Sequence, residues 1–417
     1  MRRNALLLPL LAGVYCFLVL TAIFLSACSG RSSKTIIEGR ADGLSGPNPV
    51  VAELIHFEGD YAKIWAVDTL REGRFRFELD SLAESGNRYG IMLETRPAVP
   101  VKKRAYVPEM LCYPPELFLE PGVRVRIKGL ARHYQTAKIT SPVKDQQLRQ
   151  RFLKRLSWAG WDRYQDLYAE RNAISSRLTL DTTLTPKAQD SLRARAGILL
   201  AQRDSLGKIL VSRQIQLMAT EPVGQYWMYE LDHLAKAVSR GFYREFRPDI
   251  QRLFDGLPPE VKDSPEGREI EDYLSPVKIV RIGDTLPDYE YIDRSGRACR
   301  LTEFLGKTVL LDFWSLGCGG CILSMPSLKQ LHEEAGDGLE IVSISLDKDA
   351  AWKRGHVEHP VSWTDWRDPS GSSGSVRSFK TRGIPTFVLI SPQGVVLDIR
   401  EGFSESWLQE EVLGAVK

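Results

Sequence analysis

One stretch near the C-terminus restricts the fold of this 417-residue chain more than any other. It begins with an apolar run at 308–313, which predicts a buried strand. Two cysteines, Cys318 and Cys321, follow a turn of small residues and are separated by two glycines. Apolar residues then recur at helical spacing as far as Leu331. The two cysteines therefore lie where a core strand gives way to a helix.

This position suits thiol chemistry. The N-terminus of a helix presents unpaired N–H groups and a partial positive charge, and both favour a thiolate over a thiol. Cys318 comes first and is expected to be exposed, so it is the natural nucleophile. Cys321 follows by nearly one turn and can close a disulfide with it. The pattern predicts a redox-active Cys318–Cys321 disulfide.

Length and composition predict two or three compact domains. Hydrophobic residues make up 43% of the chain and charged residues 26%, which is enough apolar material for real cores. The formal net charge is only +3, and the basic residues are spread along the chain rather than clustered. Composition therefore gives no argument for nucleic acid as a partner.

The N-terminus carries a predicted export signal. Two arginines precede an almost wholly apolar run at 5–24, and a Leu-Ser-Ala-Cys sequence ends at Cys28. This order is typical of a secretory signal, and its end resembles the lipobox of bacterial lipoproteins, in which the cysteine is acylated. We expect a lipoprotein signal peptide at 1–27, lipid attachment at Cys28 and a flexible tether at 28–33. The alternative is an uncleaved transmembrane anchor, because the apolar run would nearly span a bilayer. Both interpretations place the body on the periplasmic side of a bacterial membrane, tethered to it.

Two further cysteines, Cys112 and Cys299, would then lie in an oxidising compartment. They could form a disulfide that joins the first and last domains. The alternative is two separate buried thiols, which we favour because spacing does not fix connectivity and free cysteines are often buried.

Residues 34–140 predict a β-rich domain. Short runs rich in Val, Ile, Phe and Tyr are separated by turn-forming residues, at 36–40, 49–57, 62–67, 75–79 and 89–93. The runs 116–120 and 123–127 flank Pro121-Gly122, and we expect them to form a hairpin. The regular spacing favours an antiparallel β-sandwich or barrel.

Residues 141–276 predict a helical region. Runs with an amphipathic pattern or with helix start and stop signals predict helices at 143–156, 186–218, 226–238, 248–254 and 266–273. Four aromatic residues, Trp158, Trp161, Tyr164 and Tyr168, could form an aromatic binding face. At helical spacing a packing stripe is the favoured interpretation.

Residues 277–417 predict an α/β domain, because strands and helices alternate. Strands are expected at 308–313, 339–346, 385–390 and 395–399, and helices at 320–334, 350–356, 375–381 and 405–416. Five motifs occur in order along this region: a Gly-Asp-Thr-Leu-Pro-Asp lead-in at 283–288, Asp312-Phe313-Trp314, Cys318-Gly319-Gly320-Cys321, Met325-Pro326 and Gly383-Ile384-Pro385-Thr386. Through these motifs the chain resembles, over about residues 280–417, the thioredoxin superfamily, and most closely the TlpA/ResA-like extracytoplasmic thiol–disulfide oxidoreductases. The two preceding regions resemble poorly characterised modules of envelope lipoproteins.

The resemblance implies roles for residues around the cysteines. The Ile384–Pro385 bond is expected to be cis and to face the sulfurs, so that Ile384 can pair with a substrate peptide, and Trp314 is expected to contribute to substrate binding. Asp312 is expected to be buried beneath Cys321, with a raised pKa, and to deprotonate it. The alternatives are an ordinary proline at the start of a strand and an exposed acid.

The motif also departs from the family pattern. Ser324 stands where many members have a glutamate, so Asp312 carries more of the expected proton transfer. Gly320 replaces a common proline, and Ile322 replaces a frequent basic residue. The resemblance therefore predicts the reaction but not the reduction potential.

The predicted function is thiol–disulfide exchange that reduces disulfides of envelope proteins and depends on a membrane-bound reducing partner. No metal or organic cofactor is implied. One alternative is a peroxiredoxin-like peroxidase, which shares the fold but needs a cysteine after a threonine-proline turn. Another is an envelope binding lipoprotein in which the redox domain is an accessory.

Overall fold

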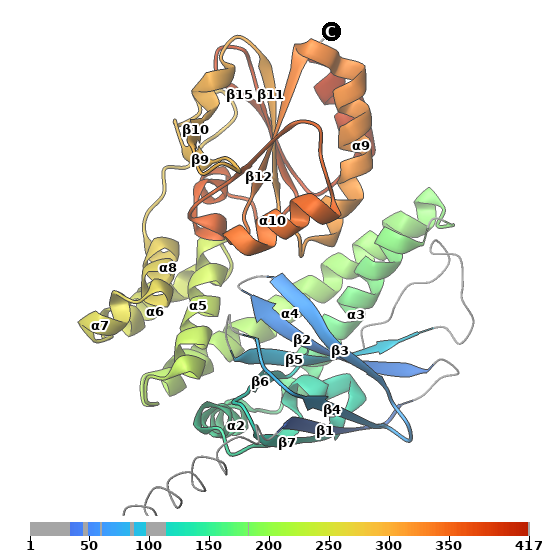
Figure 1. Cartoon of the computed structure of the whole chain (residues 1–417), viewed down its shortest axis with the longest axis vertical. Helices are drawn as coiled ribbons and strands as arrows, with labels where there is room; N and C mark the ends of the chain where they lie inside the picture. The colour runs from blue at the N-terminus through green and yellow to red at the C-terminus, as the bar shows by residue number, and fades with distance from the viewer. Residues whose placement is uncertain are drawn as a thin grey trace, which may run out of the picture.

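The computed structural model describes residues 34–44, 49–58, 61–83, 87–96, 114–181 and 183–415. The chain forms a β-rich region, a helical region and an α/β region, in that order (Figure 1). The expected signal peptide and tether lie outside the described residues, as do Cys28 and Cys112. No helix within these ranges has the length and apolar character needed to cross a membrane.

The β-rich region consists of two four-stranded sheets. One sheet has the order β4 (Arg74–Leu79), β1 (Thr35–Asp42), β7 (Arg124–Leu130) and β8 (Lys138–Thr140). The other has the order β3 (Tyr61–Thr69), β2 (Val50–Glu58), β5 (Arg88–Thr95) and β6 (Glu116–Phe118). Strand β4 alternates between exposed and buried residues, as a strand with one solvated face does. The inner faces of both sheets share one apolar core, with Ile37, Leu54 and Tyr89 fully buried.

Two details of the predicted β-region are wrong. The sheets are not purely antiparallel, because β1 pairs in parallel with β7. The expected hairpin at 116–127 does not form, since β6 pairs with β5 in one sheet and β7 with β1 in the other. Residues 116–119 are buried without alternation, so this run belongs to a covered strand, and the chain changes sheets at Pro121-Gly122. There the Gly122 N–H donates to Thr35 Oγ1 at 2.9 Å. The structure shows no closed barrel in the described β-region.

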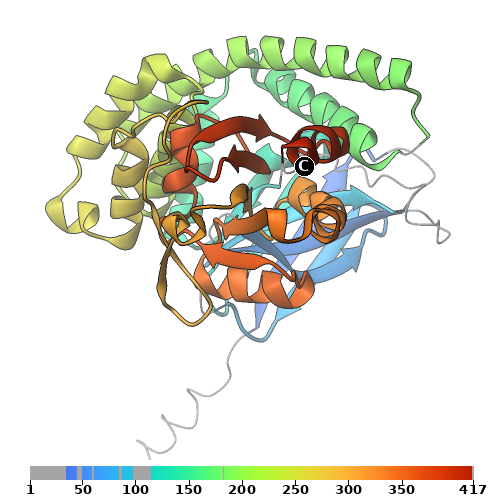
Figure 2. The same ribbon diagram turned by 90° about the horizontal axis from the view of Figure 1, so that it is seen from above.

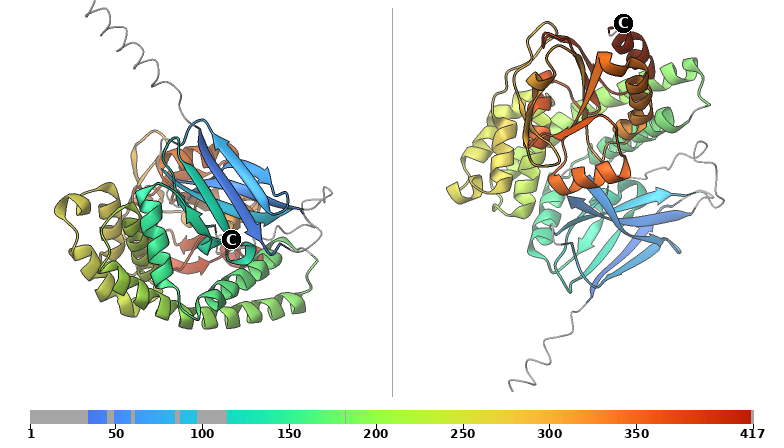
Figure 3. Two further views of the ribbon diagram at one scale, coloured as in Figure 1. Left: turned by 90° about the horizontal axis from the view of Figure 1, so that it is seen from below. Right: turned by 45° about the horizontal axis from the view of Figure 1, so that its top comes forward.

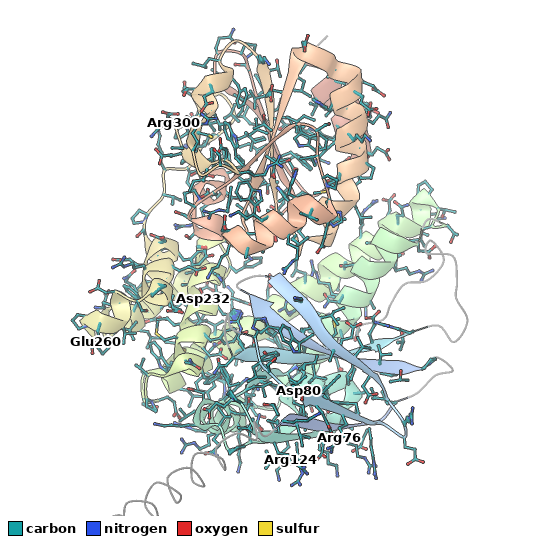
Figure 4. All side chains as sticks on the ribbon, viewed as in Figure 1. Arg76, Asp80, Arg124, Asp232, Glu260 and Arg300 are labelled. Carbon is teal, nitrogen blue, oxygen red and sulfur yellow. A yellow bond between two sulfur atoms is a disulfide. The ribbon has the colours of Figure 1, made fainter. Side chains whose placement is uncertain are left out.

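The outer face of the first sheet is strongly charged. Glu38 on β1 lies at the centre of three arginines, Arg76, Arg124 and Arg126, and forms ion pairs with all of them. Figure 4 shows Arg76 and Arg124 on this face. The three arginine side chains are exposed to solvent, so these ion pairs contribute little to stability.

The helical region follows. Its helices are α2 (Lys144–Leu156), α3 (Trp161–Leu180), α4 (Pro186–Met218), α5 (Gln225–Ser239), α6 (Arg247–Asp255), α7 (Pro259–Lys262) and α8 (Pro265–Leu274). Thr185 caps α4 by accepting from the Ala188 N–H, and Pro186 occupies the first helical position. Helices α3 and α4 form a long antiparallel hairpin along one side of the molecule (Figure 2).

The α/β region contains one seven-stranded sheet. Its order is β10 (Ala298–Arg300), β9 (Glu290–Ile292), β13 (Thr364–Arg367), β12 (Leu339–Ser345), β11 (Thr308–Trp314), β14 (Thr386–Ile390) and β15 (Val396–Glu401). Strand β11 lies near the centre and is buried along its whole length. Helices α9 (Gly319–Ala335) and α10 (Asp349–Glu358) follow β11 and β12. A last helical segment at Glu405–Val412 packs with α9 on the face that carries Leu310.

Candidate active site

The two cysteines begin α9 directly after the loop that ends β11. Cys318 is the N-cap residue, and its sulfur accepts a hydrogen bond from the Cys321 N–H at 3.1 Å. The two residues form a disulfide with their Cα atoms 5.2 Å apart. Cys318 is partly exposed, whereas Cys321 is only 1% exposed. An incoming thiol or disulfide can therefore reach Cys318 but not Cys321.

A buried aspartate that the sequence analysis missed fixes the loop before the cysteines. Asp347, which follows β12, accepts from the Ser315 hydroxyl at 3.0 Å and from the Leu316 N–H at 2.7 Å. The Gly317 N–H donates in turn to the Ser315 oxygen. Asp347 thus connects the ends of two adjacent parallel strands and sets the path of the chain into Cys318. Its position directly after a predicted strand was the available signal.

Two tryptophans form the wall behind the sulfurs. Trp314, at the end of β11, and Trp352, on α10, are 2% and 1% exposed and pack with Cys321 in one apolar cluster. Helix α10 comes close because it has Gly355 there, where an added Cβ would lie 2.9 Å from the Trp314 ring. Trp314 is thus buried beside Cys321, and its expected contribution to substrate binding stays a prediction.

Asp312 belongs to a polar row across the sheet. It lies on β11 beside Ser343 on β12, which lies beside Asp365 on β13. The Ser343 hydroxyl donates to Asp312 Oδ2 at 3.0 Å, and the Trp363 indole N–H donates to the same hydroxyl oxygen at 2.9 Å. Asp312 Oδ1 is buried without a partner. The strand register places all three side chains on the face of the sheet that carries Trp314.

Both carboxyls of this row have raised pKa values. Removal from water, partly offset by the Ser343 hydrogen bond, raises the pKa of Asp312 to about 7, and the charge of Asp365 adds to the shift. Burial likewise raises the pKa of Asp365 to about 6, although the Trp352 indole N–H donates to it at 2.9 Å. Asp312 can therefore gain or lose a proton near neutral pH.

The predicted cis bond between Ile384 and Pro385 is confirmed. Pro385 faces the cysteine motif, because a Cβ added to Gly320 would lie 3.2 Å from the proline Cδ. Ile384 is partly buried and packs against the cluster of Cys321 and the two tryptophans. The structure thus brings Ile384 and Pro385 together with the cysteines, from a segment more than 60 residues further along the chain.

Cys299 lies apart from this site. It lies on β10 and is a fully buried free thiol. The thiol donates to the Arg297 carbonyl oxygen, with 3.4 Å between sulfur and oxygen. Burial raises the pKa of its thiol, so it resists ionisation.

Helix α10, whose Trp352 packs with Cys321, lies on the side of the α/β region that faces the rest of the chain (Figures 1 and 3). Two contacts with the helical region lie next to the site in sequence. Lys348, adjacent to Asp347, pairs with Glu269 on α8 at 3.8 Å. Arg382, which precedes the cis-proline segment, lies over the ring of Phe242 at 5.5 Å. The helical region therefore contacts the loops on both sides of the disulfide.

Comparison with known proteins identifies relatives of the last region. A sequence model described as thioredoxin-like matches residues 306–396. The thiol–disulfide oxidoreductase ResA of Oceanobacillus iheyensis is 32% identical over 138 residues, which cover 30% of this chain and 67% of that protein. ResA of Bacillus cereus is 29% identical over 148 residues, which cover 34% of this chain and 83% of that protein. A solved structure of a putative thiol:disulfide interchange protein DsbE from Chlorobium tepidum has 29% identity and a TM-score of 0.31, and the match covers 33% of this chain and 99% of that one.

Proposed function

Because this chain belongs, through its C-terminal third, to the thioredoxin-like thiol–disulfide oxidoreductases of the ResA type, we propose that it reduces disulfides of proteins in the cell envelope. The observation that carries the proposal is the pair of cysteines at the start of α9, one accessible and one buried, together with Asp312, whose pKa is raised to about 7 and which lies on the sheet face that carries Trp314. This arrangement provides a nucleophile, a resolving thiol and a proton acceptor.

The exchange proceeds in two steps from the reduced site. The Cys318 thiolate attacks one sulfur of the substrate disulfide, forms a mixed disulfide and releases the other substrate sulfur as a thiolate. Cys321 then gives its proton to the Asp312 carboxylate and attacks Cys318, which releases the second substrate thiolate and leaves the Cys318–Cys321 disulfide. Two electrons pass to the substrate. A dithiol donor must then reduce the site again for another cycle.

The place of action follows from the N-terminal sequence rather than from the folded regions. In this proposal Cys28 carries the lipid, residues 1–27 are removed, and the chain is held on the periplasmic side of a membrane. That compartment is oxidising, so a reductase there needs a reducing partner in the membrane. Ile384 would pair with the substrate backbone, as the family resemblance implies, since it is only partly buried and packs against the cluster that contains Cys321.

Trapping of the intermediate tests the mechanism. Cys321→Ser in the full chain removes the resolving thiol, so we expect covalent adducts between Cys318 and envelope proteins that disappear when a reducing agent is added before electrophoresis. Cys318→Ser should form none, because Cys321 is buried. Cys299→Ser is the matched control, since that thiol is buried away from the site.

The same experiment separates the alternative functions. A protein that only binds partners would yield no Cys321→Ser adducts and would bind equally well as Cys318→Ser. A peroxidase would be oxidised at Cys318 by peroxide and would form no adducts with disulfide proteins. The absence of adducts in Cys321→Ser would overturn the exchange mechanism.

The reduction potential tests the direction of electron flow. Titration of the Cys318–Cys321 pair against glutathione should give a potential below about −230 mV, the reducing side of the glutaredoxin range. A value near about −120 mV, which is typical of strong periplasmic oxidants, would identify an oxidase instead.

A further inference from the structure

A cavity in the helical region lies apart from the cysteine site. It occupies about 440 Å³ and lies among α2, α3, α4 and α5, with Glu116 of β6 also in its lining. This volume is in the range of small-molecule sites. Three of the aromatic residues that could have been a packing stripe or a binding face, Trp161, Tyr164 and Tyr168, line it. The binding face is therefore the interpretation that this cavity favours.

Arg149, on α2, is the feature that points to a ligand. Its side chain lines the cavity and is only 7% exposed, yet Nε and Nη1 are sealed from solvent without a hydrogen-bond partner among the described residues. A buried guanidinium in this state is costly, because its lost hydration is not replaced. A group that enters the cavity meets a guanidinium with Nε and Nη1 still available for hydrogen bonds.

A second cation lies across the cavity on α4. The guanidinium carbon of Arg203 lies over the rings of Tyr164 and Tyr168, 5.1 and 4.9 Å from their centroids, and Nη2 donates to the Tyr164 hydroxyl at 3.0 Å. Its Nε is also buried without a partner. The stacking fixes the plane of the guanidinium, which suits it to recognise a planar carboxylate.

Two acids partly balance these cations. Glu116 and Glu230 also line the cavity, and the structure places both near Arg149. Burial and the neighbouring charge of Glu116 raise the pKa of Glu230 to about 7, and burial raises that of Glu116. Burial therefore favours the uncharged form of both acids, whereas the two guanidinium groups stay charged.

The backbone is also arranged around this space. Tyr243, which lines the cavity, has φ of +49°, in the left-handed region. Its hydroxyl lies against Gly207 in the middle of α4, where an added Cβ would be 2.1 Å from it. A non-glycine residue in the left-handed region and a glycine inside a helix each reduce stability, and such costs cluster at ligand sites.

We propose that this cavity binds a small organic carboxylate with an aromatic or apolar body. The carboxylate would pair with Arg149, and the body would pack against Trp161 and the tyrosines. The site is independent of the proposed redox function, since none of its residues belongs to the α/β region.

Three probes of nearly the same shape test the charge requirement: phenylacetate, phenylacetamide and phenethylamine, titrated calorimetrically into the full chain in detergent micelles. Phenylacetate should bind saturably, in about the millimolar range for so small a ligand. The neutral amide and the amine should bind at least about tenfold more weakly. Tighter binding of the amine, or no saturable binding of phenylacetate, would overturn the proposal.

Two variants locate the site. Arg149→Met should weaken phenylacetate binding by about ten- to hundredfold, because the cation that would pair with the carboxylate is replaced by an apolar chain of similar length. The thermal midpoint is measured alongside, since Glu116 and Glu230 lose a buried counter-charge in this variant. Arg151→Met is the matched control on the exposed side of the same helix and should leave binding unchanged. Equal binding by Arg149→Met would overturn the proposal.

Gly207→Ala provides a second route if Arg149→Met folds poorly. Its new methyl group must displace the Tyr243 hydroxyl, so phenylacetate binding should weaken, whereas Gly197→Ala on the same helix has open space around it and should bind normally. Unchanged binding in Gly207→Ala would count against the site. Cys318→Ser should bind phenylacetate as the unmodified chain does, which separates this test from that of the redox mechanism.

Discussion

At the scale of single residues, Asp312 decides how the proposed reaction depends on pH. Its pKa is raised to about 7, mainly by burial, so the carboxyl is protonated below that pH and can accept the Cys321 proton only above it. We predict that the release of substrate from the mixed disulfide accelerates as pH rises through about 7. Asp312→Asn should remove this inflection and slow the step at pH 8 by about a hundredfold. Stopped-flow tryptophan fluorescence can follow the step, because Trp314 and Trp352 pack beside Cys321.

The same carboxyl has an effect on stability with a definite sign. An unfolded aspartate has a pKa of about 3.9, so between about pH 4 and pH 7 the folded chain holds a proton that the unfolded chain has released. Stability contributed by this group therefore falls as pH rises through that window. Asp312→Asn should stabilise the α/β region at pH 8, by up to about 4 kcal/mol, and much less at pH 4. Hydrogen exchange of β11 amides at the two pH values measures the difference, with the surface substitution Asp337→Asn as control.

Asp365 is predicted to tune Asp312 rather than to react. It lies one strand beyond Ser343, and its charge contributes to the raised pKa of Asp312. Asp365→Asn should therefore move the inflection in the release rate to lower pH, by less than about one unit, and keep the maximal rate. A shift to higher pH would contradict the electrostatic coupling between the two carboxyls.

At the scale of elements, two helix glycines offer a matched pair of substitutions. Gly355 in α10 lies against the Trp314 ring, 2.9 Å from where a Cβ would stand, whereas Gly197 in α4 has nothing within 4 Å. Gly197→Ala should stabilise its helix by about 0.5–1 kcal/mol. Gly355→Ala gains the same helix propensity but must push Trp314 toward the cysteines, so we expect lower stability and an altered rate of disulfide reduction. Thermal unfolding and the fluorescence change on reduction check both expectations.

The sequence predicts elements well where periodicity decides them. Strand β11, helix α9 and the long helix α4 all form where apolar spacing and capping residues place them. Periodicity does not decide which strands pair with one another. Residues 116–119 and the alternating run at β7 flank a turn signal, but their partners lie in different sheets, and long-range packing rather than the turn decides this.

The active site divides in the same way. The disulfide, the buried Asp312 and the cis-proline all lie in the motifs that carry the family resemblance, so sequence spacing and that resemblance could identify them. Asp347 and Asp365 were missed because each acts through the strand register, which brings residues together from β11, β12 and β13. The cavity around Arg149 was missed for a similar reason, since its lining comes from four helices, strand β6 and the segments that contain Pro114, Thr136 and Tyr243.

At the scale of the whole molecule, the α/β region is attached to the helical region through Arg377. Its guanidinium donates to the last carbonyls of α8, at 3.0 Å to Tyr273 and 2.8 Å to Ser275, and also contacts the Asp272 carbonyl. A cation at this position donates hydrogen bonds to carbonyls that have no partner within the helix, and it complements the negative end of the helix dipole. Burial and the nearby charge of Arg247 both disfavour the charged guanidinium and lower the pKa of Arg377. The hydrogen bonds to the three carbonyl oxygens offset this cost.

We predict that Arg377→Ala loosens the α/β region from α8 and costs about 2 kcal/mol of stability, because three charge-assisted contacts are lost at once. Hydrogen exchange should accelerate in the last turn of α8 and in residues 373–380, while the amides of β11 keep their protection. Arg268→Ala, on the exposed side of the same helix, is the control. If exchange in both segments is unchanged in Arg377→Ala, the two regions are held together by other contacts, and Lys348 with Glu269 becomes the pair to test. If exchange accelerates and adduct formation by Cys321→Ser rises with it, the helical region restricts access to Cys318.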